Sequence, residues 1–190
     1  IKIVEDVLIE FNKEIVKSLE KQNCKSQGIN TKKNNIISVV QDNKELGFVG
    51  FPTDINKSTI DMIVNEKKVP VIAPLGLNVD SQTFNINADT AAGSIAKKLK
   101  ARRLIIMSDV EGVLDSNNKL IPEINSNSIK NLIENETITG GMIPKINNCL
   151  DVASNGVKGV VIIDGRKNHS LLFELLSDKG SGTLIRQWKN

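Results

Sequence analysis

Asn85-Ile86-Asn87-Ala88-Asp89 stands between a short alternating run and a longer helical run. This pattern predicts a junction between a strand and a helix, and in open α/β folds ligands bind at such junctions, beyond the carboxyl ends of strands. Asn is a poor strand former, so Asn85 and Asn87 are expected to face a ligand or to hold the backbone in place. Asp89 has two interpretations, a ligand-facing carboxylate or the N-cap of the following helix.

Strands and helices are expected to alternate on both sides of this junction. Near the start of the chain, apolar residues recur every four positions, which predicts an amphipathic helix packing that face on a core. The face consists of Ile3, Val7, Phe11, Ile15 and Leu19. Strands are expected at 36–40, 46–50, 69–74, 83–86, 104–108, 157–163 and 183–186, and helices at 56–66, 90–100, 126–136, 144–155 and 169–176. A loop is expected at 25–35 and turns at 52–54 and 78–82. Such alternation is typical of a mainly parallel sheet covered by helices on both faces.

Composition excludes several classes of protein. The chain has 190 residues, of which 39% are hydrophobic, so a single globular domain with its own core is expected. A net charge of only +3, with 3% aromatic residues and no Tyr, argues against nucleic acid and membrane partners. Cys24 and Cys149 lie far apart without metal-type spacing and are expected to be reduced thiols of a cytoplasmic protein. No signal peptide or long apolar span is present in the sequence.

A second candidate site follows two glycines, Gly140 and Gly141. Pro144 fits the first position of a helix, which would place Lys145 in the first turn. A cation there opposes the helix dipole by a few tenths of a kcal/mol or more, whereas a phosphate group binds well at such a helix start. Lys145 is therefore expected to face a polyanion, with a solvated surface lysine as the alternative.

Other motifs are less informative. Asp109 follows a buried strand and could hold a nucleotide or a metal, or could cap a turn. The chain has no P-loop and no dinucleotide-binding fingerprint. Its one histidine, His169, has no serine or cysteine partner at a recognisable elbow, and no cluster of His and Cys predicts zinc. No metal site is predicted from these residues.

Taken together, three motifs resemble the acetylglutamate kinase branch of the amino-acid kinase family. They are Asn85 to Asp89, Ser108-Asp-Val-Glu-Gly-Val-Leu-Asp115 and Gly140-Gly-Met-Ile-Pro-Lys145. Asp164-Gly165, His169 and Gly180-Ser-Gly-Thr183 follow in the same order, so the likeness covers nearly the whole chain. The resemblance implies an α/β fold of the amino-acid kinase type, a three-layer αβα sandwich forming one domain over 1–190, with the nucleotide-binding part at about 85–190.

The resemblance also implies a reaction and roles for residues. The family transfers the γ-phosphoryl group of ATP, with Mg²⁺, to the side-chain carboxylate of N-acetyl-L-glutamate, on the way to arginine. Lys145 would stabilise the transferring phosphoryl, and Asp89 would organise the catalytic lysines. Asn85 and Asn87 would bind the acetylglutamate. The nucleotide would be bound by Ser108, Asp109, Val110, Glu111, Gly112, Val113, Leu114, Thr137, Ile138, Thr139 and Met142.

Regulation and partners are implied in the same way. His169, Gly180 and Gly182 resemble the arginine-feedback site of arginine-sensitive members, whereas a histidine that caps the last helix is the alternative for His169. A homo-oligomer, dimer or hexamer, is expected. Members in plastids and cyanobacteria bind the PII signalling protein, so the PII protein is a candidate partner. The richness in Asn, Ile and Lys indicates an AT-rich coding genome, which suits a bacterial cytoplasm or, alternatively, a plastid.

The chain differs from the family pattern in two places. The family carries an N-terminal section with a catalytic lysine, two glycine-rich loops and a substrate-binding arginine, and Ile1 matches a point just after that arginine. Residues 1–190 alone are therefore not expected to phosphorylate acetylglutamate. The glycine-rich loop after the first helix is replaced by Gly28-Ile-Asn-Thr-Lys-Lys-Asn34. Two alternatives are a kinase for a related carboxylate of the aminoadipate type and a non-catalytic module that binds nucleotide or arginine.

Overall fold

The computed structural model describes residues 1–187, which form parts of two compact units, Ile1–Lys98 and Leu99–Asn190. Residues 188–190 of the expected domain lie outside the described residues, and the single domain over 1–190 stays a prediction. Helices and strands alternate along both units, which confirms the α/β class. Within 1–187, none of the helices combines the length and apolar character needed to cross a membrane.

The first unit begins with α1 (Lys2–Lys21), the predicted amphipathic helix. Its predicted inner face is wrong, because Ile3, Val7 and Phe11 are exposed, and the fully buried residues are Ile9 and Asn12. Residues four apart drift around a helix by about 40° per step, so a four-residue repeat does not stay on one face for five turns. The helix packs mainly on β1 (Ser26–Ile29) and β4 (Val69–Ile72) and also contacts β6 (Thr83–Asn85), where Glu5 accepts from the hydroxyl of Thr83 at 3.0 Å.

Strand β1 replaces part of the loop expected at 25–35. It pairs in parallel with β4, and this pairing outweighs the polar composition of the segment. Gly28 on β1 lies directly against α1, since a Cβ added there would come 2.5 Å from Oδ1 of Asn12. The Nδ2 group of the same Asn12 donates to the carbonyl of Val71 on β4 at 2.9 Å. One buried amide thus sits where the helix meets both strands.

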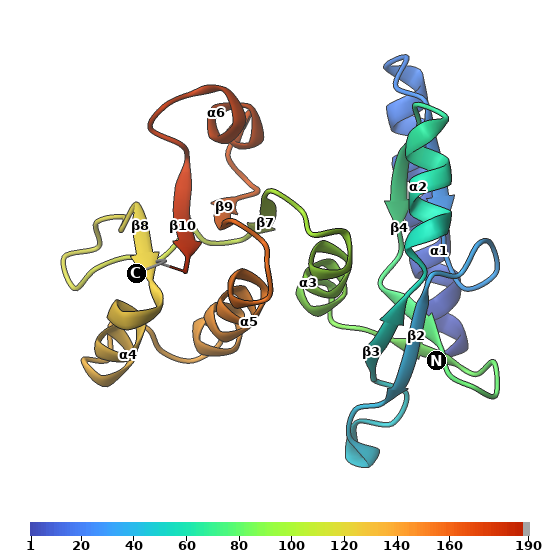
Figure 1. Ribbon diagram of the computed structural model, residues 1–190, viewed down its shortest axis with the longest axis horizontal. Helices are drawn as coiled ribbons and strands as arrows, with labels where there is room; N and C mark the ends of the chain where they lie inside the picture. The colour runs from blue at the N-terminus through green and yellow to red at the C-terminus, as the bar shows by residue number, and fades with distance from the viewer. Residues whose placement is uncertain (188–190) are drawn as a thin grey trace. The chain divides into compact units, whose positions relative to one another are not determined.

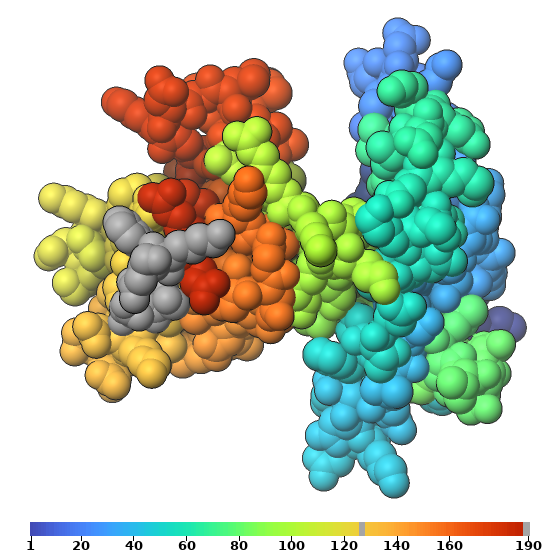
Figure 2. Space-filling model, in the orientation of Figure 1, coloured from blue at the N-terminus to red at the C-terminus, as the bar shows by residue number. Residues whose placement is uncertain are grey.

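A four-stranded sheet of order β3-β2-β5-β6 completes the strands of the first unit. Its strands are β2 (Ile37–Gln41), β3 (Gly50–Ile55), β5 (Leu75–Leu77) and β6 (Thr83–Asn85). The strand expected at 46–50 is wrong, because the 3-10 helix η1 (Lys44–Leu46) ends at its first residue and β3 begins only at its last. Figure 2 shows this part of the chain projecting from the rest of the first unit. The turn expected at 52–54 is also wrong. Pro52 fits within β3 because this strand lies at the sheet edge, beside a register shift between Ser38 and Val39.

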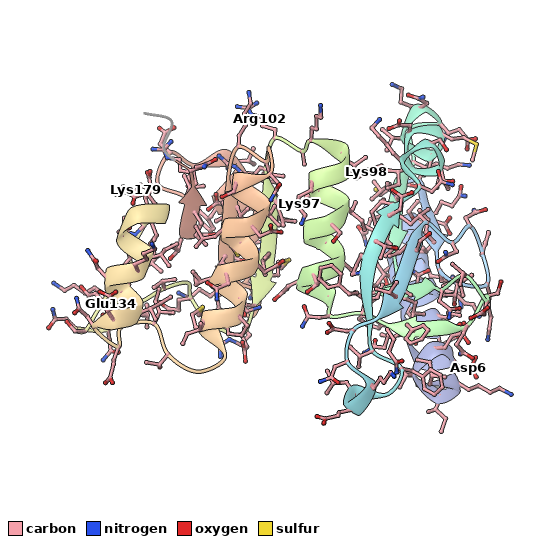
Figure 3. The ribbon with its side chains drawn as sticks, turned by 60° about the horizontal axis from the view of Figure 1, so that its bottom comes forward. Asp6, Lys97, Lys98, Arg102, Glu134 and Lys179 are labelled. Atoms are coloured by element: carbon pink, nitrogen blue, oxygen red, sulfur yellow. The ribbon has the colours of Figure 1, made fainter. Side chains whose placement is uncertain are left out.

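Two further helices were predicted close to their positions. α2 (Lys57–Asn65) is capped by Asn56, whose Oδ1 accepts from the N–H of Thr59 at 3.4 Å, and it buries Ile60 and Ile63. α3 (Ala88–Leu99) buries Ala91, Gly93 and Ala96. Lys98 lies on the side of α3 that faces β3, where its Nζ pairs with Asp54 at 2.7 Å (Figure 3).

The second unit is built on a sheet of order β7-β9-β10-β8 (Figure 1). The strands are β7 (Leu104–Ser108), β9 (Val160–Asp164), β10 (Gly182–Arg186) and β8 (Glu123–Asn125), the last of which was not predicted. β7 runs parallel to β9, β9 is antiparallel to β10, and β10 is parallel to β8. The sheets of both units therefore combine parallel and antiparallel pairs.

Three helices accompany this sheet. α5 (Met142–Ser154) packs on β9 and β10, α6 (Ser170–Leu176) on β9, and α4 (Ser126–Glu134) on β8. Ile146 and Val152 of α5 are buried with Ile162 and Ile163 of β9. α5 begins two residues before the expected Pro144, which stands at the third helical position, where a proline is still tolerated because no intrahelical N–H bond is lost. Lys145 remains in the first turn, as predicted.

Candidate functional site

The junction between β6 and α3 holds the candidate residues of the first unit. The N–H of Asn85 donates to the carbonyl of Phe48 at 2.9 Å, and the N–H of Ile86 donates to the carbonyl of Pro74 at 2.9 Å. The ring of Phe48 contacts that of the buried Phe84, with centroids 5.7 Å apart. Backbone bonds on both sides thus fix the position from which the half-buried Asn85 side chain extends.

Asn87, not Asp89, caps the helix. Oδ1 of Asn87 accepts from the N–H of Thr90 at 3.1 Å and from its hydroxyl at 3.4 Å. The interpretation of Asp89 as the N-cap is therefore wrong. Asp89 is the second residue of α3 and half-buried, and a carboxylate in this first turn is favoured by the helix dipole. The structure brings Asn85, Asn87 and Asp89 together at one junction, as the sequence predicted.

In the second unit, the candidate nucleotide loop, residues 109–114, leaves the carboxyl end of β7. This end lies beside the end of β9, since Ser108 is paired with Asp164 in the parallel register. The N–H of Gly165 donates to the carbonyl of Ser108 at 2.8 Å, and the hydroxyl of Ser108 donates to Oδ1 of Asp109 at 3.2 Å. Two neighbouring parallel strands therefore end together, which is where ligands bind in α/β sheets.

The second half of the nucleotide loop is packed tightly against β10. Gly112 has a φ of +138°, and a Cβ added there would come 2.6 Å from the hydroxyl of Thr183. The N–H of the buried Val113 donates to that same hydroxyl at 2.9 Å. The first half is exposed and carries Glu111, whose carboxylate pairs with Nζ of Lys167 at 2.7 Å.

Asp164, at the end of β9, is the charged residue of this edge that sequence reasoning did not single out as a site residue. Its buried carboxylate accepts from Nε and Nη2 of Arg166 at 2.9 and 3.0 Å and from the Arg166 N–H at 2.9 Å. The guanidinium and backbone N–H of Arg166 lower the pKa of Asp164 from 3.8 to about 2. Asp164 and the nearby Asp109 and Glu111 raise the pKa of Arg166 in turn. The signal in the sequence was available, because Asp164 follows its strand as Asp109 follows β7.

Residues 137–142 form the glycine segment between α4 and α5. Ile138 is buried, whereas Thr139, Gly140 and Gly141 are exposed. The N–H of Met142 donates to the carbonyl of Thr139 at 3.2 Å, a local bond. No described atom lies within 4 Å of where a Cβ would stand at Gly140 or Gly141. Gly141 supplies no side-chain cap to α5, so the space beside this helix start is not filled by a side chain, as a phosphate site requires.

The third group of candidates surrounds the start and end of α6. His169 is exposed and has a φ of 63°, and although it occupies the N-cap position its side chain makes no capping hydrogen bond, so the capping alternative is wrong. Gly180 has a φ of +67°, and a Cβ there would come 2.8 Å from Glu174 Oε2. A Cβ at Gly182 would overlap the carbonyl oxygen of Ile162 on β9. Close packing alone therefore explains why glycine occupies positions 180 and 182.

Glu174 is a residue of this third group that the sequence did not point to. Its buried carboxylate pairs with Nη1 of Arg103 at 3.2 Å and accepts from the N–H of Ser181 at 2.9 Å. A cavity of about 290 Å³ lies beside it, lined also by Gly180 and Gly182. Sequence reasoning had no signal for it, because the apolar residues of α6 are exposed and the helix buries Ser170 and Glu174 instead. Across 1–187, His, Cys, Asp and Glu side chains form no group of three or more that could hold a metal ion.

Comparisons with known proteins show the family of this chain. The amino acid kinase family matches residues 1–164. A relative from Pelagibacter ubique, named acetylglutamate kinase, is 74% identical over 187 residues, covering 98% of this chain and 65% of the relative. Another acetylglutamate kinase, from Campylobacter fetus, is 46% identical over 177 residues, covering 93% of this chain and 63% of that protein. The chain thus spans slightly less than two thirds of the length of these relatives.

The fold is shared with solved structures as well. N-acetylglutamate synthase from Neisseria gonorrhoeae, solved with coenzyme A and N-acetyl-glutamate, superposes with a TM-score of 0.82 at 20% identity. The match covers 97% of this chain and 44% of that chain. At this identity the likeness concerns the fold alone, and it confirms the fold class expected from the sequence.

Proposed function

The chain belongs to the amino acid kinase family, and on that premise we propose that the whole protein transfers the γ-phosphoryl group of ATP to the side-chain carboxylate of N-acetyl-L-glutamate. The product would be an acyl phosphate, formed early in arginine biosynthesis. The observation that carries this proposal is the 74% identity over 187 residues to a relative named acetylglutamate kinase. The strand-end and helix-start positions of the candidate residues support it.

On the acceptor side, Asn85 and Asn87 are proposed to bind the acetylglutamate. Asn85 is suited to this role because backbone bonds fix its position while its side chain stays partly exposed. Asn87 already uses Oδ1 to cap α3, so its own contribution would come from the Nδ2 donor. Asp89 is proposed to organise the catalytic lysines from the first turn of the same helix.

On the donor side, we assign the nucleotide to residues 108–114 together with Thr137, Ile138, Thr139 and Met142. The residues present fit such a ligand, since Gly140 and Gly141 leave open space at a helix start that no side chain caps. Bound ATP supplies the phosphoryl group. Lys145, half-buried in the first turn of α5, would meet the charge that develops on that group.

This assignment gives a mechanism of positioning and charge stabilisation, without a covalent enzyme intermediate. Asn85 would orient the acceptor carboxylate, and the pinned loop 109–114 would orient the donor, which together remove much of the entropic barrier. Because the described residues hold no cluster of metal-binding side chains, Mg²⁺ would be held mainly by nucleotide phosphates and water, as is usual for this ion.

Regulation, assembly and location are proposed as well. His169, Gly180 and Gly182 are assigned to an arginine-feedback site, to which we add the buried Glu174 as a partner for a cationic ligand. A homo-oligomer, dimer or hexamer, is supported by the exposed apolar residues Ile3, Val7 and Phe11 of α1. A cytoplasmic location is proposed because the chain holds only two cysteines, Cys24 and Cys149, which lie far apart in the sequence, and a PII signalling protein is proposed as a further partner.

The test is an assay of the whole protein with MgATP, in which hydroxylamine traps the acyl phosphate. Asn85→Ala should mainly raise the KM for acetylglutamate, because it removes binding felt equally in ground and transition states. Asp89→Asn should mainly lower kcat. Asn65→Ala, a change of an exposed asparagine at the end of α2, is the matched control and should alter neither constant.

Two outcomes would contradict the proposal. If both variants weakened only ATP binding, the assignment of the two residues would be wrong. If N-acetyl-aminoadipate were the better acceptor in the same assay, the substrate would belong to the aminoadipate type.

A further inference from the structure

Thr183, the second residue of β10, has a fully buried side chain that bonds to two distant segments at once. Its hydroxyl accepts from the N–H of Val113 at 2.9 Å and donates to the carbonyl of Ile121 at 2.7 Å. The exposed fraction of Thr183 is 0%. Both functions of one hydroxyl, acceptor and donor, are therefore used in the interior of the second unit.

These bonds fix the end of the nucleotide loop at Val113 and close the loop formed by residues 114–120. The N–H of Ile121 donates to the carbonyl of Val113 at 2.8 Å, so the chain on either side of residues 114–120 is joined directly and through Thr183. The backbone of Gly112 lies against the same hydroxyl, with no room for a Cβ. The conformation of 112–121 is thus set by a side chain more than sixty residues away in the sequence.

Threonine suits this position for two reasons. Its β-branched side chain is favoured on a strand, and its hydroxyl replaces the water that would otherwise satisfy Val113 and Ile121. Valine has the same shape but neither bonding function. A buried N–H or carbonyl left without a partner is destabilising, so the loop would shift toward solvent to recover those bonds.

We infer that Thr183 is a positioning residue for the nucleotide: it does not contact the ligand, but it holds residues 109–114 in the conformation that binds it. The inference rests on the proposed function, which assigns the nucleotide to this loop. It also separates Thr183 from Gly180 and Gly182, with which the sequence grouped it, because the hydroxyl faces the loop after β7 and not the cavity beside Glu174.

The experiment compares Thr183→Val and Thr183→Ser in the whole protein. Thr53→Val is the matched control, because the Thr53 hydroxyl also bonds a strand carbonyl, that of Ser38 at 3.2 Å, but at an exposed position in the other unit. Isothermal titration gives the Kd for MgATP, steady-state kinetics give KM for each substrate and kcat, and thermal unfolding reports stability.

Thr183→Val should weaken MgATP binding about tenfold, because the loop loses both hydrogen bonds and shifts away from the conformation that binds the nucleotide. The KM for ATP should rise with it, whereas the KM for acetylglutamate should stay unchanged. Thr183→Ser keeps the hydroxyl and should bind MgATP within about threefold of wild type. Thr53→Val should resemble wild type in every binding constant.

A second measurement does not depend on how the valine variant folds. In the wild type without nucleotide, the Val113 amide should exchange slowly with deuterium, because Thr183 already accepts its hydrogen bond. Exchange as fast as that of an exposed loop amide would overturn the inference. So would a folded Thr183→Val that binds MgATP normally, or a Thr183→Ser as weak as Thr183→Val. A wild type that binds no MgATP would instead show that the proposed function itself is wrong.

Discussion

The two segments assigned to the nucleotide are held in opposite ways. Loop 109–114 is tied to the rest of its unit by side chains, through Thr183 at Val113 and Lys167 at Glu111. The glycine segment, 137–142, has local backbone bonds, and open space surrounds Gly140 and Gly141. The first segment is therefore shaped before any ligand arrives, whereas the second can still adapt to one.

This difference suggests that the two segments bind different parts of the nucleotide. A pre-shaped loop lowers the conformational entropy lost on binding, so it suits the part of the ligand that is held throughout the reaction. An open helix start with adaptable glycines suits the group that moves between donor and acceptor. The predictions below test each half of this comparison.

The largest effect is expected at Lys145, which follows the open segment. Lys145→Ala should lower kcat about 10²- to 10³-fold, because a cation that meets developing charge is lost. Folding should be nearly unchanged, as measured by the thermal midpoint. Lys130→Ala, at an exposed lysine of α4, is the control and should keep full turnover. Near-normal kcat in Lys145→Ala would contradict the comparison, because the glycine segment 137–142 would then not place a lysine at the transferred phosphoryl group.

The second largest effect is expected at Gly112 in loop 109–114. Gly112→Ala requires a non-glycine residue at a φ of +138° and brings Cβ 2.6 Å from the Thr183 hydroxyl. Backbone strain of this kind costs about 1–3 kcal/mol, so both urea stability and MgATP affinity should fall. Gly141→Ala, in open space at a φ of −65°, should leave stability nearly unchanged. Equal losses in the two variants would show that the segments do not differ in tightness.

A smaller, pH-dependent effect on stability is expected at Asp164, at the end of β9 and close to loop 109–114. The folded-state pKa of Asp164 lies at about 2, below its ordinary 3.8. Because that pKa is depressed, the stabilisation from ionised Asp164 is present above about pH 3.8 and is lost as the pH falls through about 2. Arg166→Gln should move the pKa back up, since burial then acts without the guanidinium. Carboxyl ¹³C NMR titration measures it, and an unchanged pKa would contradict the assigned cause.

The smallest effect is expected at Lys167. Both side chains of the Lys167–Glu111 pair are about half exposed, at 53% and 49%. Exposed ion pairs contribute less than about 1 kcal/mol, so Lys167→Gln should change MgATP affinity only slightly, and less at 0.5 M salt than at low salt. A loss as large as that of Thr183→Val would show that the exposed half of the loop, and not its buried base, sets the conformation.

Much of the fold was available from the sequence, because most elements have a local signal. Asn56 before α2, the apolar run of β7 and the glycines before α5 each predict an element from nearby residues. The failures are non-local. Strand β1 forms because β4 lies beside it, and Pro52 fits β3 because that strand is at an edge. Neither fact is visible in the residues of the segment itself.

The candidate site shows the same limit. The sequence placed Asn85, Asp109 and Lys145 at strand ends and a helix start, where the structure has them. It left Asp89 as either the cap or a ligand-facing carboxylate, because Asn and Asp cap helices about equally well, and only the hydrogen bond from Thr90 identifies Asn87 as the cap. It did not separate Thr183 from its neighbouring glycines, because the partners of its hydroxyl are more than sixty residues away.

The contact of Gly28 with Asn12 has a consequence for how this protein can change over generations. A side chain at position 28 would displace the amide of Asn12, and that amide also holds α1 to the carbonyl of Val71. Neither position can therefore vary first without a penalty, whereas a smaller residue at 12 would open room for alanine at 28. Related proteins should thus usually differ at both positions or at neither. A relative that differs at only one of them should carry a compensating change near Val71.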